Sequence, residues 1–233
     1  MGTGKSAKEL SDLIVRLVQV LFGVILAQGI LRNSELIVSP FSSQNIVAAL
    51  GFGSLYFTTV RSWIDWHITM SKYPYDIRTD SPHSTTEMLR LWTDIGFVVT
   101  YAYLLFTVEN VIGNPGANLL PHLQGYAALF ALYWVSGALR RRNYGISAGQ
   151  LRAIGTFGSL YGILLFTYWQ ILEQSSVASE PVMAWINSGA LAVIFLVTAA
   201  YRSHRQKLRK TGADPDTVSM IDNSVAESVS SNT

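Results

Sequence analysis

The stretch LIVRLVQVLFGVILAQGIL at residues 13–31 decides how this chain is interpreted. It is almost entirely apolar, and at about 1.5 Å per residue a helix of this length crosses the ~30 Å hydrocarbon core of a bilayer. Further runs of similar length and character occupy residues 46–64, 91–112, 119–139, 151–172 and 182–201. The sequence therefore predicts an all-α, polytopic membrane protein with six transmembrane helices.

The composition supports this class. Of 233 residues, 49% are hydrophobic and only 14% are charged, whereas a soluble domain carries about 25% charged residues. The net charge of +2 is too small to indicate a nucleic-acid-binding protein by itself. The chain has no cysteine, which excludes disulfides, thiolate catalysis and Cys-ligated metal sites.

Local signals mark where some of these helices begin and end. Ser84 and Glu87 have the spacing of a capping box ahead of an apolar run, and Pro181 suits the first turn of the last helix. Asn114-Pro115-Gly116 predicts a tight turn between the third and fourth spans.

The basic residues predict the orientation. If the N-terminus is cytoplasmic, Arg32 is the one residue among the 17 Lys and Arg that falls on the outer side. This is the positive-inside pattern for an even number of crossings, so both termini are expected in the cytoplasm. We expect a six-helix domain over residues 1–210 and a disordered cytoplasmic tail over 211–233, because the tail lacks Lys, Arg and aromatic residues.

The first helix carries a narrow stripe of small and polar residues at helical spacing. The stripe consists of Arg16, Gln19, Gly23, Ala27, Ile30 and Ser34. In an otherwise apolar helix such a stripe faces either another helix or water. Helix packing explains Gly23 and Ala27, whereas a pore explains Arg16 and Gln19. In the pore interpretation, Ala27 and Ile30 lie near an apolar constriction that closes by dewetting.

Other ionisable residues occur near the ends of the spans. Arg61, Asp65 and Asp94 lie at similar depth near the cytoplasmic ends of the second and third helices, as an interfacial ion pair or as part of a charged vestibule. Glu109, near the outer end of the third helix, would attract cations at an outer mouth or be a solvated helix end.

Two basic clusters follow the fourth and sixth spans. Arg140, Arg141 and Arg142 form the first, and residues 202–210 contain the second. Both are typical of topology signals and of contacts with anionic lipid. The alternative is a binding surface for an anionic signal such as an oligonucleotide. No catalytic or metal-binding motif is evident, so we expect neither an enzyme nor a cofactor or metal site.

One short repeat suggests internal symmetry. Phe52-Gly53-Ser54-Leu55-Tyr56 recurs at residues 157–161. This offset would superpose the first three helices on the last three in opposite orientation, as in many secondary transporters. The alternative is coincidence within a membrane-biased composition.

The first two helices resemble those of the lysosomal and prokaryotic potassium-permeable six-helix channels. The resemblance rests on Arg16-Leu17 at the start of the first helix and on Trp63-Ile64-Asp65-Trp66-His67 at the end of the second. Val20, Leu21 and Phe22 replace the Phe-Ser-Asp signature of that family, so potassium selectivity is not implied. The resemblance implies a homotetramer whose first helices line the pore. Small membrane proteins of this kind also resemble pore-forming anti-phage effectors, including the Hailong type, which an oligonucleotide-like signal controls.

The sequence therefore predicts an oligomeric ion channel in the cell membrane, in which residues 13–31 line the conduit. The role that the resemblance suggests is antiviral defence. A secondary transporter with inverted repeats, and a scaffold that recruits partners through the cytoplasmic loop and tail, are the alternatives.

Overall fold

The computed structural model describes residues 3–38, 46–75, 84–144, 148–174 and 179–210, and in these ranges it is all-α with no strand. The elements are α1 (Thr3–Arg32), α2 (Ser34–Val38), α3 (Ile46–Lys72), α4 (Ser84–Gly113), α5 (Leu120–Tyr144), α6 (Ala148–Gln174) and α7 (Glu180–Lys210). Five of the six predicted apolar runs lie within one long helix each, and the run 119–139 begins one residue before α5. The short helix α2 was not predicted, and the tail 211–233 lies outside the described residues.

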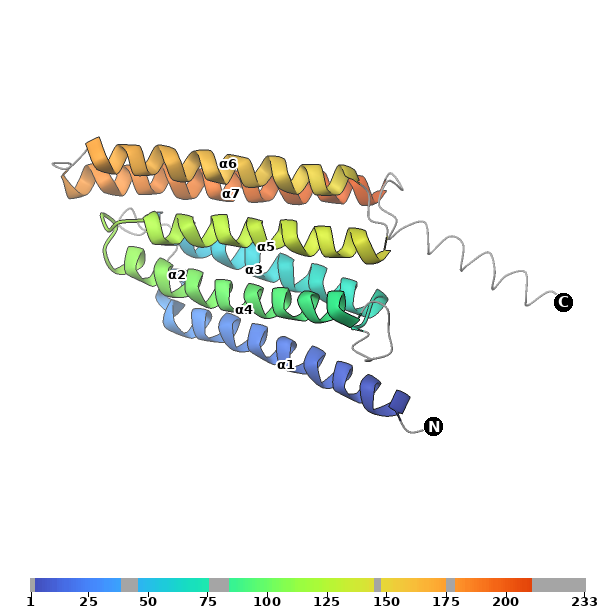
Figure 1. The fold of residues 1–233 in the computed structure, drawn as a ribbon. Coiled ribbons are helices and arrows are strands. Elements are labelled where there is room, and N and C mark those ends of the chain that lie inside the picture. The colour runs from blue at the N-terminus through green and yellow to red at the C-terminus, as the bar shows by residue number, and fades with distance from the viewer. Residues whose placement is uncertain (1–2, 39–45, 76–83, 145–147, 175–178, 211–233) are drawn as a thin grey trace.

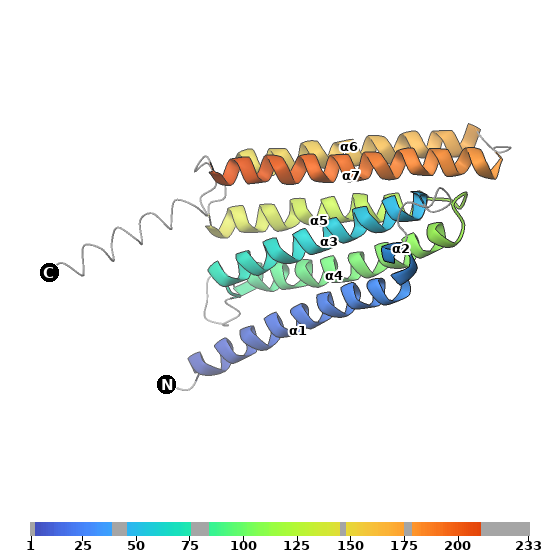
Figure 2. The ribbon, with the colours of Figure 1, turned by 180° about the vertical axis from the view of Figure 1, so that it is seen from behind.

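The six long helices run side by side, each antiparallel to the long helix before it (Figure 1). α1 begins and α7 ends at the same end of the bundle, which we call the basic end. The turn between α4 and α5 lies at the opposite end. Seen from the front and from behind, α1 lies at the flank farthest from α6 and α7 (Figures 1 and 2), and it packs against α3 and α4.

Several helix boundaries have the predicted chemistry. α4 begins at Ser84, and Pro181 lies in the first turn of α7. In the turn after α4, Asn114 accepts hydrogen bonds from the backbone of Gly116 and Ala117 at 3.1 and 2.9 Å. At the end of α1, the side-chain amide and the backbone N–H of Asn33 both donate to the carbonyl of Gly29, at 3.0 and 3.1 Å. Ser34 belongs to α2, so it is not on the predicted stripe of α1.

Three helices are long and apolar enough to cross a membrane, over Asp12–Arg32, Ser84–Gly113 and Glu180–Lys207. The shortest of the other three long helices, α5, has 25 residues, roughly 37 Å at the α-helical rise. Polar side chains that face the interior lower the hydropathy of these helices. His122 of α5 and Thr58 of α3 are fully buried, and Thr58 satisfies its hydroxyl by bonding to the Ser54 carbonyl at 2.7 Å.

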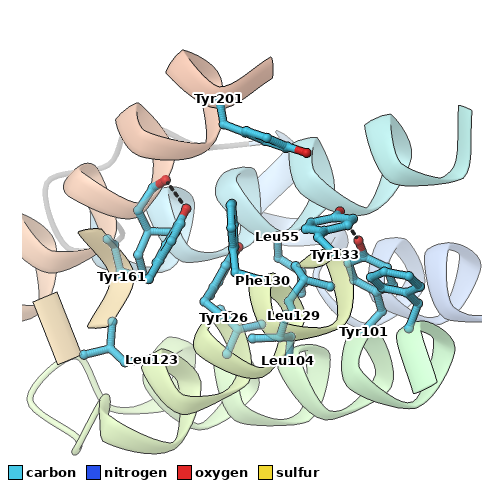
Figure 3. Close-up of a cluster of buried hydrophobic side chains, with 14 of the residues drawn as sticks. Leu55, Tyr101, Leu104, Leu123, Tyr126, Leu129, Phe130, Tyr133, Tyr161 and Tyr201 are labelled. Carbon is cyan, nitrogen blue, oxygen red and sulfur yellow. Dashed lines mark hydrogen bonds between the residues drawn. The ribbon is translucent and has the colours of Figure 1, made fainter. Parts of the chain in front are cut away.

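The middle of the bundle is filled by large side chains from five helices. Tyr126 and Tyr161 stack with their rings 5.7 Å apart, and Phe130 lies between Tyr161 and Tyr133 in the same cluster (Figure 3). Leu104 and Leu129 are fully buried beside them. This packing holds α5 against α4, α6 and α7 and fills the middle of the bundle.

Candidate functional site

The buried charges of this protein gather at the basic end. Throughout the described ranges, the charged residues classed as buried are Asp65, Glu87, Arg90, Asp94, Arg140, Arg202 and Arg205. They come from α3, α4, α5 and α7. A partly open cavity of about 50 Å³ lies among them, and Asp65, Asp94, Arg90, Arg140 and Arg205 contribute to its wall. We call it the arginine cavity.

Two arginines of α7 meet one aspartate of α3. Arg202 and Arg205 are about one helical turn apart, so their side chains share a face. Both donate to the same Oδ2 atom of Asp65, with Arg205 at 2.8 Å and Arg202 closer. Because all three side chains are almost completely buried, this double ion pair joins α3 to α7 in surroundings where charge attraction is strong.

Hydroxyl groups extend the network toward the middle of the bundle. Arg202 also donates to Ser62 Oγ at 2.6 Å and to the Tyr133 hydroxyl at 2.8 Å. Tyr133 is in turn 2.8 Å from the hydroxyl of Tyr101, as the dashed line in Figure 3 shows. Tyr101 and Tyr133 therefore line the arginine cavity on the side that faces the aromatic cluster in the middle of the bundle.

α4 contributes two further charged residues to the cavity wall, Asp94 and Arg90. Asp94 accepts hydrogen bonds from Trp66 Nε1 at 3.0 Å and from the Tyr75 hydroxyl. Arg90 donates to Glu87 at 3.2 Å and to the Tyr73 carbonyl at 2.6 Å, and it lies over the ring of Tyr75. Residues 73–75, which follow α3, are thus tied to α4. Burial raises the pKa of the Tyr75 hydroxyl, which keeps it a hydrogen-bond donor.

Arg140 of α5 is the remaining cation of the cavity wall. Only 9% of its surface is exposed, and its Nε donates to the Ser136 carbonyl at 3.3 Å. Arg140 stays charged at neutral pH although Arg205 and Arg90 lie nearby, because a guanidinium group is not deprotonated in proteins.

The charged residues that the sequence predicts as functional lie in different surroundings in the structure. Asp65 and Asp94 line the same cavity, but Asp65 pairs with the α7 arginines, and Arg61 is half-buried and is not among the described residues of the cavity wall. Arg140 is buried, whereas Arg141 and Arg142 are exposed. At the opposite end, Glu109 accepts a salt bridge from Arg32 at 2.9 Å.

The stripe of α1 is mostly on the outside of the subunit. Arg16, Gly23, Ala27 and Ile30 are exposed, while Gln19 is half-buried and bonds to His67 of α3 at 3.0 Å. A side chain added at Gly23 would meet no atom within 4 Å. Within the subunit, Gly23 and Ala27 therefore do not serve helix packing.

The buried face of α1 lies on another side of the helix. Val18 and Phe22 enter the core, and Gly29 allows the ring of Tyr56 to approach, because a Cβ there would lie 2.5 Å from the tyrosine oxygen. This close contact, rather than the Gly23–Ala27 pair, attaches α1 to α3.

The two copies of the repeated pentapeptide have different surroundings. Ser54 and Leu55 are buried in α3, whereas their counterparts Ser159 and Leu160 are exposed on α6. The two copies therefore differ in burial at these two positions.

Sequence reasoning missed Arg90, Arg202, Arg205 and the tyrosine hydroxyls as members of one site. The available signal was the three-residue spacing of Arg202 and Arg205, which places both on one face of α7. The sequence instead favours a topology signal or a lipid contact for the basic run 202–210, with a binding surface for an anionic signal as the alternative.

Comparison with protein-family models, with curated proteins and with solved structures gives no match for this chain. The resemblance to the potassium-permeable six-helix channels therefore stays a prediction from a few residues of the first two helices.

Proposed function

We propose that all six long helices cross a membrane and that the basic end faces the cytoplasm. Each long helix exposes large apolar side chains, which lipid would cover. Examples from the three helices of lower hydropathy are Ile46 of α3, Val135 of α5 and Ile163 of α6, with exposures of 47, 39 and 62%. The lengths and antiparallel order of the helices support the same arrangement, as does the concentration of Lys and Arg at the end where α1 begins and α7 ends.

We further propose that the protein is an oligomeric ion channel or pore whose conduit runs between subunits along α1. The observation that carries this proposal is the outward position of the α1 stripe on a subunit whose middle is filled. Tyr126, Leu129 and Phe130 close the middle of the bundle, so a path for ions needs a surface between copies. The stripe includes the charged Arg16, and no side chain of the same chain covers Gly23, so water is a more favourable environment for this face of α1 than lipid.

The number of subunits and the biological role rest on other grounds. A homotetramer and a role as a gated anti-phage effector follow from the resemblance of the first two helices alone. We retain them as the more specific form of the proposal.

The test compares two polar substitutions on α1. Ile30→Asn places an amide on the stripe, and Val24→Asn places the same amide about a third of a turn away, on the side rich in exposed Leu and Val. Both positions are about half exposed, at 46 and 51%, so neither change disturbs the core. If the stripe lines a pore, Ile30→Asn should wet the constriction and raise the current in planar bilayers, and Val24→Asn should not. Equal background currents from two properly assembled variants would contradict the pore.

A secondary transporter is the second candidate, and the arginine cavity is the observation that favours it. A polar cavity inside a single subunit, lined by residues of α3, α4, α5 and α7, is suited to binding a solute. Saturable exchange of an anion by proteoliposomes, without unitary current steps, would favour this candidate over the pore. The scaffold alternative concerns segments 76–83 and 211–233, which lie outside the described residues.

A further inference from the structure

The charges around the arginine cavity do not balance. Within the part of the chain that the structure describes, the buried charged residues are four arginines and three acids, namely Arg90, Arg140, Arg202, Arg205, Asp65, Asp94 and Glu87. When all are ionised, one positive charge is in excess. An uncompensated buried charge is costly, and proteins normally pair it or neutralise it. The excess therefore calls for a negative charge in this cavity.

The excess can be traced to particular groups. Arg202 and Arg205 share Asp65, and Arg90 is paired with Glu87. Asp94, the third acid, interacts electrostatically with both Arg90 and Arg140, so three acids are shared among four arginines. Within the described ranges, the hydrogen bond that Arg140 makes goes to the Ser136 carbonyl, which carries no net charge. In addition, the Nε atom of Arg205 is buried without a hydrogen-bond partner, and Arg205 lines the cavity. The guanidinium group of Arg205 thus keeps a donor, at the cavity wall, that the described residues do not satisfy.

The size and lining of the cavity restrict the ligand. Its volume of about 50 Å³ accommodates one small ion or a few waters. Arg90, Arg140 and Arg205 approach from three different helices, and Ser62, Ser136 and Tyr133 add hydroxyl groups. Planar guanidinium forks match the paired oxygens of an oxyanion better than a spherical halide.

We propose that the arginine cavity binds a single phosphate group, held by Arg140 and Arg205. The group is either free inorganic phosphate or the phosphate of a lipid headgroup, because the two present the same oxygens. The site lies within one subunit, so this proposal does not depend on the pore or on the number of subunits.

The first measurement is thermal unfolding of the purified full-length protein in detergent, prepared without phosphate. Potassium phosphate is titrated against potassium chloride at equal ionic strength. We expect a saturable rise in Tm with phosphate and none with chloride, because a ligand that binds only the folded state stabilises it. Equal responses to the two salts, or no response to either, would overturn the proposal.

Arg140→Gln tests the residue that carries the argument. This change removes the positive charge that is in excess, so without phosphate the variant should unfold at the same temperature as the parent or higher, and its response to phosphate should disappear. A merely structural arginine would instead lower the Tm in every buffer. Arg141→Gln, at the exposed neighbouring position, is the matched control and should keep the full phosphate response.

Arg140→Lys covers the case in which the glutamine variant does not fold. It keeps the charge but loses the planar fork, and it should weaken binding of radiolabelled phosphate at least tenfold. Unchanged phosphate binding by this variant would overturn the role of Arg140.

The source of the phosphate is separated by adding phosphatidylglycerol to delipidated protein before the titration. Loss of the response to free phosphate assigns the site to a headgroup, and its persistence assigns the site to the free anion. Since no current is measured in these experiments, their failure would leave the proposed pore intact, and failure of the pore would leave the phosphate site intact.

Discussion

Buried polar side chains join the helices at both ends of this bundle, but the groups that do so are neutral at one end and charged at the other. At the opposite end, the fully buried amide of Asn187 donates to the carbonyls of Pro115 and Ala117 and accepts from Tyr168, each at 2.8 Å. Tyr168 in turn accepts from the backbone of Leu119 at 2.9 Å. This network is neutral, and it joins α6 and α7 to the turn between α4 and α5.

At the basic end, four buried arginines and three buried acids join the helices, counted over the residues that the structure describes. Among these residues, Nε of Arg202 and Nε of Arg205 are buried and have no hydrogen-bond partner. In a neutral network whose hydrogen-bonding groups are all paired, the interactions hold the helices together and no donor or acceptor is left to bind a ligand. A charged network with unused donors around a cavity retains binding capacity. The contrast between the ends therefore separates a structural element from a candidate site.

The largest effect is expected at Asp65. Asp65→Ala would leave two buried arginines without their carboxylate, and removing one partner of a buried ion pair costs about 3–5 kcal/mol. We expect a large loss of Tm in detergent and a reduced yield of folded protein. Arg61→Gln, one turn away and half-buried, should have little effect. If the two variants are equally stable, the ion pair does not hold α3 to α7.

A smaller effect is expected at Asn187. Asn187→Ala leaves the carbonyls of Pro115 and Ala117 without a donor, at a cost of about 1–3 kcal/mol per unsatisfied group. The variant should melt earlier than the parent, yet its response to phosphate should be unchanged, because the arginine cavity is at the other end. A lost phosphate response in a folded Asn187→Ala protein would show that the two ends are not independent.

The smallest effect is expected at the Arg32–Glu109 salt bridge. The Arg32 side chain is 60% exposed, so solvent screens the pair and its contribution should be less than about 1 kcal/mol. Glu109→Gln should therefore shift the Tm only slightly, which differential scanning fluorimetry can check against the Asp65 variant. A loss comparable to that of Asp65→Ala would contradict the account of both ends.

Most of the fold could be predicted from the sequence, because a span long enough to cross a membrane is a local property. The run 13–31, the start of α4 at Ser84 and Pro181 in the first turn of α7 all depend on residues close together in the chain. The end of α1 before Asn33 also depends on nearby residues, because asparagine is a common residue just after a helix. The predicted stripe included Ser34 because it assumed that the helix continues through Asn33.

The arginine cavity could not be predicted in the same way. Asp65 and Arg202 are 137 residues apart, so their pairing depends on how α3 and α7 pack. The positive-inside rule accounts for Arg140 and for the run 202–210 as charges on one side of a membrane, but it does not say which of them turn inward. Burial of Arg140 beside the exposed Arg141 follows from the rotation of α5 in the bundle.

The most direct test asks whether the two ends lie on opposite sides of a membrane. The chain has no cysteine, so single cysteines can be introduced at exposed positions, Glu173 and Ser179 at the opposite end and Ser203 and Gln206 at the basic end. With an impermeant thiol reagent added outside intact cells, the account predicts labelling of Glu173→Cys and Ser179→Cys, and labelling of Ser203→Cys and Gln206→Cys only after the cells are opened. Labelling of both pairs from outside, or of the basic pair alone, would contradict it.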